Sequence, residues 1–436
     1  MAYLYRTLGQ NNNSGKLTIS VWVKKTNQQE EDIVTSYYSG TYWGRLFFNN
    51  DGQLGFQDYR AGYIFNKYTT ATFLDHSAWM HIFATFDHTL SSPTGSIYVN
   101  GVEQTLGTDV NYTQGSTSSW LTDYTLRIGE GSSLGGSNFN GLMSDLYFIQ
   151  GYSHNVTDFG QFNSDGVWKP KTSPTVNYSS TGSNSCHLKF ESSGNIALDS
   201  GDNNVTFSSS GTVVQTEDNP SNNFTILNQL IPNVRGNCAL SAGATKIVSA
   251  DAAHRNAPTT MALKTGSGKW YWEMKAERIS THIKTGIVYD QWNKLAQGSP
   301  TEEFSASNYG YAYRNDGNKE NNGLTAYGSS YTVGDIIGIA FDAENRKLYF
   351  SKNGVWQNSA DPAAGTGEAF TVQDNLFYYP IVNLYNADVS FNFGNGHFNG
   401  TAVASGNADS AGLGVFEYAP PTGYYALNTK NLATYG

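Results

Sequence analysis

The sequence lacks the features that mark several large protein classes, and each absence excludes one kind of protein. Only Cys186 and Cys238 among its 436 residues are cysteines, so disulfide bonds cannot be what mainly stabilises the fold. No apolar run approaches about 18 residues, and no signal peptide opens the chain, so we expect no membrane insertion. No window of about 10 residues repeats apolar side chains with a helical period, so we expect very little helix.

Charge and catalytic motifs are also sparse. Charged residues make up 14% of the chain and the net charge is -10, which excludes the basic face that a nucleic-acid partner requires. The Glu-x-Asp-x-Glu pattern of concanavalin-type glycoside hydrolases is absent, and so are nucleophile motifs. Glu273 and Glu277 come closest, but with Lys275 between them we interpret them as solvated charges on a strand. We therefore predict that the protein is not an enzyme.

Aromatic residues and glycine are abundant instead. The chain has 29 Tyr, 23 Phe and 9 Trp beside 46 Gly, a mixture of strand formers and turn formers that predicts an all-β protein. Strict alternation from Leu17 to Val23 puts Leu17, Ile19, Val21 and Val23 on one face of a strand and Trp22 on the other. We expect two tandem antiparallel β-sandwiches.

The stretch Val333–Trp356 carries the clearest strand signal. Apolar runs at 336–341 and 348–350 flank a short polar break, and Asn353 with Gly354 suits a type I′ turn. A three-strand meander is therefore predicted, with Leu348 and Phe350 facing a core. Tyr349 and Ser351 then face solvent or a partner.

Ordered blocks in both halves resemble known families. LTISVWVK, SAWMHIFATFD, IYVNG, LRIG and FNGLMSDLYFIQG resemble a laminin G-like domain, a concanavalin-type jelly roll. WYWE, GDIIGIAFD, LYFSKNG, YYPIV and VSFNFG resemble a SPRY domain. We expect the jelly roll with a polar extension at 1–220, the SPRY sandwich at 221–415, and a separate C-terminal tail at 416–436.

The whole arrangement resembles tail-fibre-like or capsid-attached virion proteins of marine bacteriophages. That resemblance implies a structural protein assembled in the host cytoplasm and carried on the particle, with other virion proteins as partners. We expect a homo-oligomer that displays binding modules for host-surface glycans. The alternative is a capsid or tail decoration protein, which stays open because the chain has neither the heptads nor the β-helical repeats of a fibre shaft.

Sugars bind to aromatic faces helped by polar side chains, and loops in both halves supply that mixture. Laminin G-like domains often hold calcium at a rim, so calcium is the one cofactor considered, with Asp58, Asp109 and Asp123 as its candidate ligands. SPRY domains bind partners with loops at one end of the sandwich, which implicates 313–315, 352–356 and Asn386. The candidate contact residues are Tyr42, Trp43, Arg45, Tyr59, Trp292, Tyr313, Arg314, Asn315, Tyr327, Trp356 and Asn386.

Overall fold

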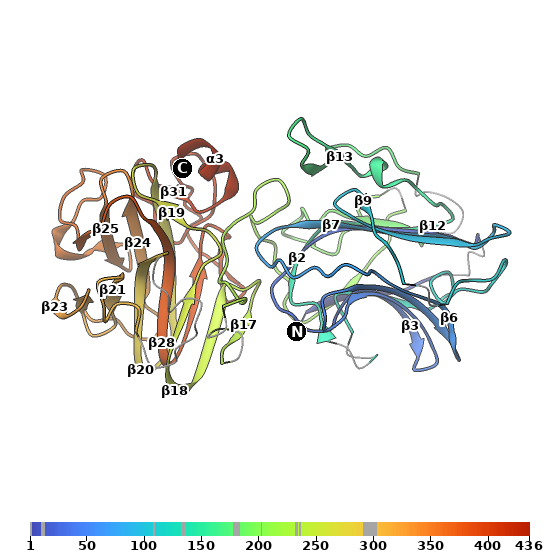
Figure 1. Cartoon of the computed structure of the whole chain (residues 1–436), viewed down its shortest axis with the longest axis horizontal. Helices are drawn as coiled ribbons and strands as arrows, with labels where there is room; N and C mark the ends of the chain where they lie inside the picture. Colours follow the sequence, from blue (N-terminus) through green and yellow to red (C-terminus); the bar gives the residue numbers. More distant parts are fainter. Residues whose placement is uncertain are drawn as a thin grey trace. The chain divides into compact units, whose positions relative to one another are not determined.

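The computed structural model describes residues 2–9, 14–107, 110–131, 134, 137–177, 184–201, 203–231, 234, 237–290 and 303–436. Strands make up 48% of it and helices 4%, which confirms the predicted all-β fold. The chain divides into two compact units, Met1–Gln215 and Thr216–Gly436, so the division lies close to the predicted boundary at residue 220 (Figure 1). Among the described residues, no helix has the length and apolar content to span a bilayer.

The first unit is a sandwich of two mostly antiparallel sheets. Figure 1 draws them as separate layers, with β2, β7 and β12 in one and β3 and β6 in the other. The predicted alternation in β2 is confirmed, because its four aliphatic residues lie in the core and Trp22 lies on the outer face. The eight-stranded sheet runs β16-β1-β10-β3-β4-β5-β6 with β11 beside β3, and the six-stranded sheet runs β15-β12-β2-β7-β8-β9. The strands are β1 Tyr3–Thr7, β2 Lys16–Lys25, β3 Glu31–Ser39, β4 Tyr42–Phe48, β5 Leu54–Arg60, β6 Tyr63–Tyr68, β7 Met80–Asp87, β8 Thr94–Val99, β9 Val102–Glu103, β10 Thr125–Ile128, β11 Ser137–Asn138, β12 Gly141–Gln150, β15 Cys186–Leu188 and β16 Ser208–Ser210.

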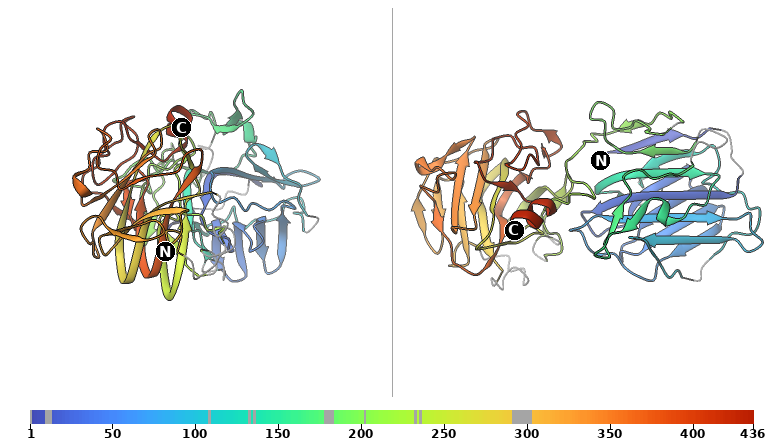
Figure 2. Two further views of the ribbon diagram at one scale, coloured as in Figure 1. Left: turned by 60° about the vertical axis from the view of Figure 1, so that its left-hand side comes forward. Right: turned by 90° about the horizontal axis from the view of Figure 1, so that it is seen from above.

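The outer face of the six-stranded sheet is covered by the chain itself. Trp22 and Phe83 on this face pack against Val156, Phe159 and Trp168 of the segment after β12. Figure 1 draws β13 over the β7 and β12 layer, and the right panel of Figure 2 shows the strands of this unit from above. Burying such rings stabilises the cover by about 1.5–3 kcal/mol per side chain. The cover contains η2 Val156–Asp158, β13 Gly160–Phe162 and β14 Trp168–Pro170.

The second unit contains strands long enough to belong to two layers. β20 pairs with β24 in its first half and with β21 in its second, and its pairing with β28 shifts register twice in the middle. Such irregularities bend a strand, so β20 and β28 pass from one layer into the other around a single core. The remaining elements pair around them. They are β17 Ala239–Ser241, β18 Lys246–Pro258, β19 Leu263–Lys264, β20 Lys269–Tyr289, β21 Gly310–Arg314, β22 Asn318–Glu320, β23 Leu324–Ala326, β24 Ile336–Asp342, β25 Lys347–Lys352, β26 Val355–Trp356, η3 Gln357–Ser359, β27 Phe370–Thr371, β28 Phe377–Asn392, β29 His397–Phe398, β30 Thr401–Ala402, β31 Tyr425–Ala426 and α3 Thr429–Tyr435.

The predicted meander is confirmed as β24, β25 and β26. Asn353 and Gly354 have φ values of 48° and 78°, the two positive angles that a type I′ turn requires. Leu348 and Phe350 lie in the core, as expected.

The C-terminal segment, which we expected as a tail at 416–436, packs against the second unit. Phe416 and Tyr424 are fully buried against Tyr271 and Tyr349, on the outer face of β20 and β25. β31 then pairs in parallel with β20, and α3 follows it, drawn in red in Figure 1. The partner that Tyr349 faces is therefore the chain's own C-terminal segment.

Candidate functional site

Four neighbouring strands of the first unit place aromatic side chains in one row. Tyr37 on β3 lies opposite Trp43 on β4, which lies opposite Tyr59 on β5, which lies opposite Tyr63 on β6. Side chains opposite one another in antiparallel strands are close enough to touch. Trp43 and Tyr59 stack with ring centres 5.0 Å apart and planes 7° apart, and Tyr63 meets them edge-on at 5.9 and 5.1 Å.

A second aromatic group lies on the adjoining ends of the same strands. Tyr38 stacks on Tyr124 at 5.1 Å and meets Tyr42 at 6.4 Å. The Arg60 guanidinium lies 5.2 Å from the Tyr42 ring and donates a hydrogen bond to the Tyr124 hydroxyl at 3.2 Å. Tyr38 is 68% exposed and Tyr63 43% exposed, so rings in both groups reach solvent. Tyr42 and Trp43 are consecutive in β4, so their side chains point to opposite faces of the sheet and the two groups lie on opposite sides of the same strand ends. We call Tyr38, Tyr42, Trp43, Tyr59, Arg60, Tyr63 and Tyr124, taken together, the aromatic patch.

Arg45, which we expected to contact a ligand, is buried beside this patch. Its guanidinium binds Glu30 at 2.9 Å and Gln57 at 3.1 Å, and lies 3.8 Å from the Asp32 carboxylate. It also covers the Phe47 ring at 3.4 Å. Burial raises the pKa of Asp32 to about 7, against the opposing effect of Arg45. Arg45 therefore supports the sheet beneath the patch and has its donors engaged within the chain.

The calcium candidates do not come together in the described residues. Asp58 is fully buried, and its carboxylate accepts hydrogen bonds from Tyr112 at 2.7 Å and from the Ser118 hydroxyl at 2.6 Å. Burial raises its pKa, which these hydrogen bonds oppose. Asp123 is exposed, and Asp109 lies outside the described residues. The structure thus gives Asp58 a place in a buried hydroxyl network and gives calcium no support from this set.

The second-unit candidates are divided between core and loops. Tyr313 is fully buried, and its hydroxyl donates to the Ser329 carbonyl, so it is a core residue. Tyr327 packs edge-on against it at 5.5 Å. Half-buried Trp356 meets the Tyr271 ring at 6.4 Å beside the C-terminal segment. Trp292 lies outside the described residues.

The polar candidates of this unit are held by the chain. Asn315 accepts a hydrogen bond from the Ile283 amide at 3.0 Å, and Arg314 pairs with Asp316 at 3.3 Å. Asn386 accepts from Arg278 at 2.6 Å. These internal contacts fix the side chains of Arg314, Asn315 and Asn386, and partner binding by the loops that contain them stays a prediction.

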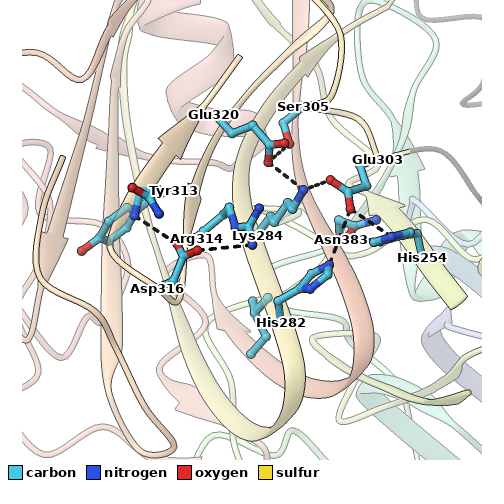
Figure 3. Close-up of polar contacts among 12 residues, drawn as sticks. His254, His282, Lys284, Glu303, Ser305, Tyr313, Arg314, Asp316, Glu320 and Asn383 are labelled. Atoms are coloured by element: carbon cyan, nitrogen blue, oxygen red, sulfur yellow. Dashed lines mark hydrogen bonds and ion pairs between the residues drawn. The ribbon is translucent and has the colours of Figure 1, made fainter. Parts of the chain in front are cut away.

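A polar cluster that the sequence did not reveal lies on the outer face of the second unit (Figure 3). In that figure Lys284 of β20 reaches between Glu303 and Glu320, and Glu303 also points toward His254 of β18. Lys284 lies 2.6 Å from Glu320, and His254 lies 2.9 Å from Glu303. His282 of β20 lies 3.6 Å from Glu303. The cluster joins three segments far apart in the sequence.

Phe304 explains why Glu303 lies there. Its ring is fully buried among Val288, Ala312 and Ile381, which belong to the outer face of β20, β21 and β28. This anchor fixes the neighbouring carboxylate over the sheet. Burial of large aromatic side chains is worth about 1.5–3 kcal/mol, enough to hold a short segment in place.

Burial favours the neutral form of both imidazoles. Burial lowers the pKa of His282 to about 4, and the positive charge of Lys284 adds to the effect. Burial also lowers the pKa of His254, which the hydrogen bond to Asn383 opposes. Desolvation lowers the pKa of Lys284, and its pairing with Glu320 opposes this. Neutral imidazoles present a lone pair, the form that binds metals.

Comparison with known families matches these two units. Residues 3–151 match the concanavalin A-like lectin/glucanases superfamily, and residues 269–396 match the SPRY domain. The chain carries a concanavalin A-like domain followed by a SPRY domain. The aromatic patch lies within the first match, whereas His254 precedes the second match.

Curated relatives resemble the SPRY region only. The ATP-dependent RNA helicase Ddx1 of Drosophila melanogaster is 31% identical over 137 residues, which cover 30% of this chain and 16% of the helicase. The helicase DDX1 of Xenopus laevis is 29% identical over 135 residues, with coverage of 30% and 16%. The chain therefore spans about a sixth of the length of these relatives.

Solved structures resemble about a third of the chain. The SPRY domain of human HERC1 has a TM-score of 0.28 and 22% identity, and covers 35% of this chain and 91% of its own. The heptameric SAP-like pentraxin of Limulus polyphemus has a TM-score of 0.27 and 19% identity, with coverage of 35% and 72%.

Proposed function

We propose that this protein is a non-enzymatic component of a bacteriophage particle that binds host-surface glycans through the aromatic patch of its concanavalin A-like domain. The observation that carries the proposal is the row of rings across four strands, which ends at the exposed Tyr63, together with the exposed Tyr38 of the second group. The resemblance of the whole arrangement to marine phage virion proteins supports the location on a particle. Other virion proteins and further copies of this chain are the proposed partners there.

The chemistry of the patch suits carbohydrates. Sugar rings carry apolar C–H faces that stack on aromatic side chains, and their hydroxyls accept hydrogen bonds from groups such as the Arg60 guanidinium. One ring contact is worth about 0.5–1.5 kcal/mol, so a single site binds weakly. Several copies on one particle would raise the effective affinity without any new contact.

The test uses the full chain on a glycan array, followed by calorimetry with the glycans that bind. Removing the exposed rings, as Tyr38→Ala and Tyr63→Ala, is expected to weaken binding about 2- to 10-fold each. Phe162→Ala is the matched control, because Phe162 is a 52% exposed ring of the same domain outside the patch.

If the protein is instead a capsid or tail decoration protein, the same glycan array should give the opposite result. A protein whose sandwiches serve as anchor and spacer on a capsid or tail would give no glycan signal above background, even when presented in many copies. Binding that Phe162→Ala and Tyr63→Ala reduce equally would also count against the patch.

A further inference from the structure

Two histidines are held side by side on the outer face of the SPRY domain. His254 on β18 and His282 on β20 both lie opposite Tyr385 of β28, the strand between them. Their ring centres are 5.1 Å apart, and each also contacts the Tyr385 ring, at 4.9 and 5.4 Å. Strand register therefore brings together two imidazoles that are distant in the sequence.

Glu303 completes a group of three ligand atoms. Its Oε1 lies 2.9 Å from His254 Nε2 and 3.6 Å from His282 Nε2, and all three atoms lie within 4.8 Å of one another. Ligands that share a tetrahedral zinc ion with bonds of 2.0–2.1 Å are about 3.3 Å apart. Among the described residues this is the one such group of His, Cys, Asp or Glu side chains.

The hydrogen bonds around His254 show which of its nitrogens is available. Asn383 donates through Nδ2 to the Asn256 side chain at 2.8 Å, so its Oδ1 is the atom that faces His254 Nδ1 at 3.1 Å. Nδ1 then carries the proton, and Nε2 carries a lone pair. A lone pair facing a carboxylate oxygen is repulsive, and either a proton on Nε2 or a metal ion bound by both atoms relieves that repulsion. An imidazole fixed by a hydrogen bond from its other nitrogen is the usual arrangement of a metal-binding histidine.

His282 provides an independent observation. Its Nε2 is shielded from solvent and has no hydrogen-bond partner in the described structure, although it points at Glu303. Buried polar atoms are almost always hydrogen-bonded, so one that is not calls for an explanation. A metal ion bound to Nε2 supplies it.

The charges of the neighbouring groups admit a cation. Lys284 binds Glu303 through Oε2 and also binds Glu320, which leaves Oε1 of Glu303 toward the histidines. Arg314 pairs with Asp316. Three carboxylates thus surround two cationic side chains, so the acidic groups around the two imidazoles outnumber the basic ones.

We propose that His254 Nε2, His282 Nε2 and Glu303 Oε1 bind a divalent transition-metal ion of the zinc type, with water as the fourth ligand. Two imidazoles and a carboxylate are a donor set that zinc takes, whereas calcium and magnesium prefer oxygen. The ion would clasp the segment that contains Glu303 to the sheet. The site is separate from the aromatic patch, so the glycan proposal can fail while this one holds.

The test is metal titration of the full chain, made without a histidine tag and stripped with a chelator. Calorimetry with Zn²⁺ is expected to show one ion per chain, and Co²⁺ is expected to show the visible absorption of tetrahedral coordination. His282→Ala and Glu303→Gln should each weaken binding at least on the order of 100-fold, and Asn383→Ala about 10- to 100-fold. His397→Ala is the matched control, a half-buried histidine of the same domain outside the group, and should bind like the unchanged chain.

Two results would overturn the proposal. One is the absence of stoichiometric Zn²⁺ binding by the unchanged chain. The other is binding that survives both His282→Ala and Glu303→Gln, since the ion would then lie elsewhere. Thermal unfolding with chelator present checks folding, and Glu303→Gln keeps the test decisive if the histidine variants unfold, because its side chain lies over the sheet and not within it.

Discussion

Glu273 fastens the C-terminal segment to the SPRY sheet, and replacing it should open that segment. The carboxylate is fully buried and accepts hydrogen bonds from the Tyr418 amide at 2.7 Å, the Glu417 amide at 3.0 Å and the Asn392 side chain at 3.0 Å. The Tyr271 hydroxyl adds a fourth at 3.1 Å. No other described group accepts the two amide hydrogens in this structure. Glu273→Ala therefore leaves both without a partner.

The size of the effect follows from those two amides. A buried donor without an acceptor costs about 1–3 kcal/mol, and both residues are half-buried, so the lower part of that range applies to each. We expect a total cost of about 2–3 kcal/mol, which lowers the free energy of local opening of the C-terminal segment before it affects the core. Amide exchange in residues 413–427 should then quicken about 30- to 160-fold.

Hydrogen–deuterium exchange read by mass spectrometry is the assay, with Glu277→Ala as the control. Glu277 lies on the same face of the same strand but is half-buried, and its side chain accepts one hydrogen bond, from Ser390 at 2.5 Å. The reasoning is refuted if exchange of the segment is unchanged in Glu273→Ala, or if Glu277→Ala quickens it equally.

Three further changes have forecasts of their own. Phe304→Ala should lower the free energy of unfolding of the SPRY domain by about 3–5 kcal/mol, measured by urea denaturation, because a fully buried ring is lost. Gly44→Ala should destabilise the concanavalin A-like domain by about 1–3 kcal/mol in the same assay, since a Cβ there would lie 2.5 Å from the Trp120 indole. Burial raises the pKa of Glu273 from 4.5 to about 7, so the folded domain holds an extra proton between those values and its stability falls as pH rises through them, by about 3 kcal/mol in total. Glu273→Gln should remove that part of the slope between pH 4.5 and pH 7, and an unchanged slope would show that the carboxyl titrates at its ordinary value.

Period-two alternation predicted the strands well and their surroundings poorly. It placed the core faces of β2 and β25 correctly, because an apolar face must be buried whatever covers the other one. It also led us to interpret Glu273 as solvated, which is wrong, and to leave Tyr349 facing solvent or a partner. Alternation shows that one face of a strand carries polar and aromatic side chains. It cannot show whether that face contacts water or a distant segment of the chain.

The candidate sites differ in the same respect. Tyr42, Trp43 and Tyr59 could be grouped from the sequence because adjacent strands joined by short turns keep sequence neighbours together in space. His254 and Glu303 were not found, because strand order in the sheet and one buried phenylalanine bring them together across distant segments. Tyr313 was taken for a contact residue, although its spacing from Tyr311 already put both on one face of a strand, and that face is the core.

In each domain, some sheet faces are covered by other segments of the same chain, and others stay exposed to solvent and so to a ligand. The segment after β12 buries Trp22, and the C-terminal segment buries Tyr271, so the rings on those two faces contribute to stability. Phe304 anchors a third, shorter cover, and Glu303 beside it completes a polar group in place of an apolar one. The first unit instead leaves Tyr63, at the end of the row through Trp43, and Tyr38 of the second group exposed. Exposed rings do not stabilise the fold as buried ones do, and for this reason the proposal assigns these two to contact with a ligand.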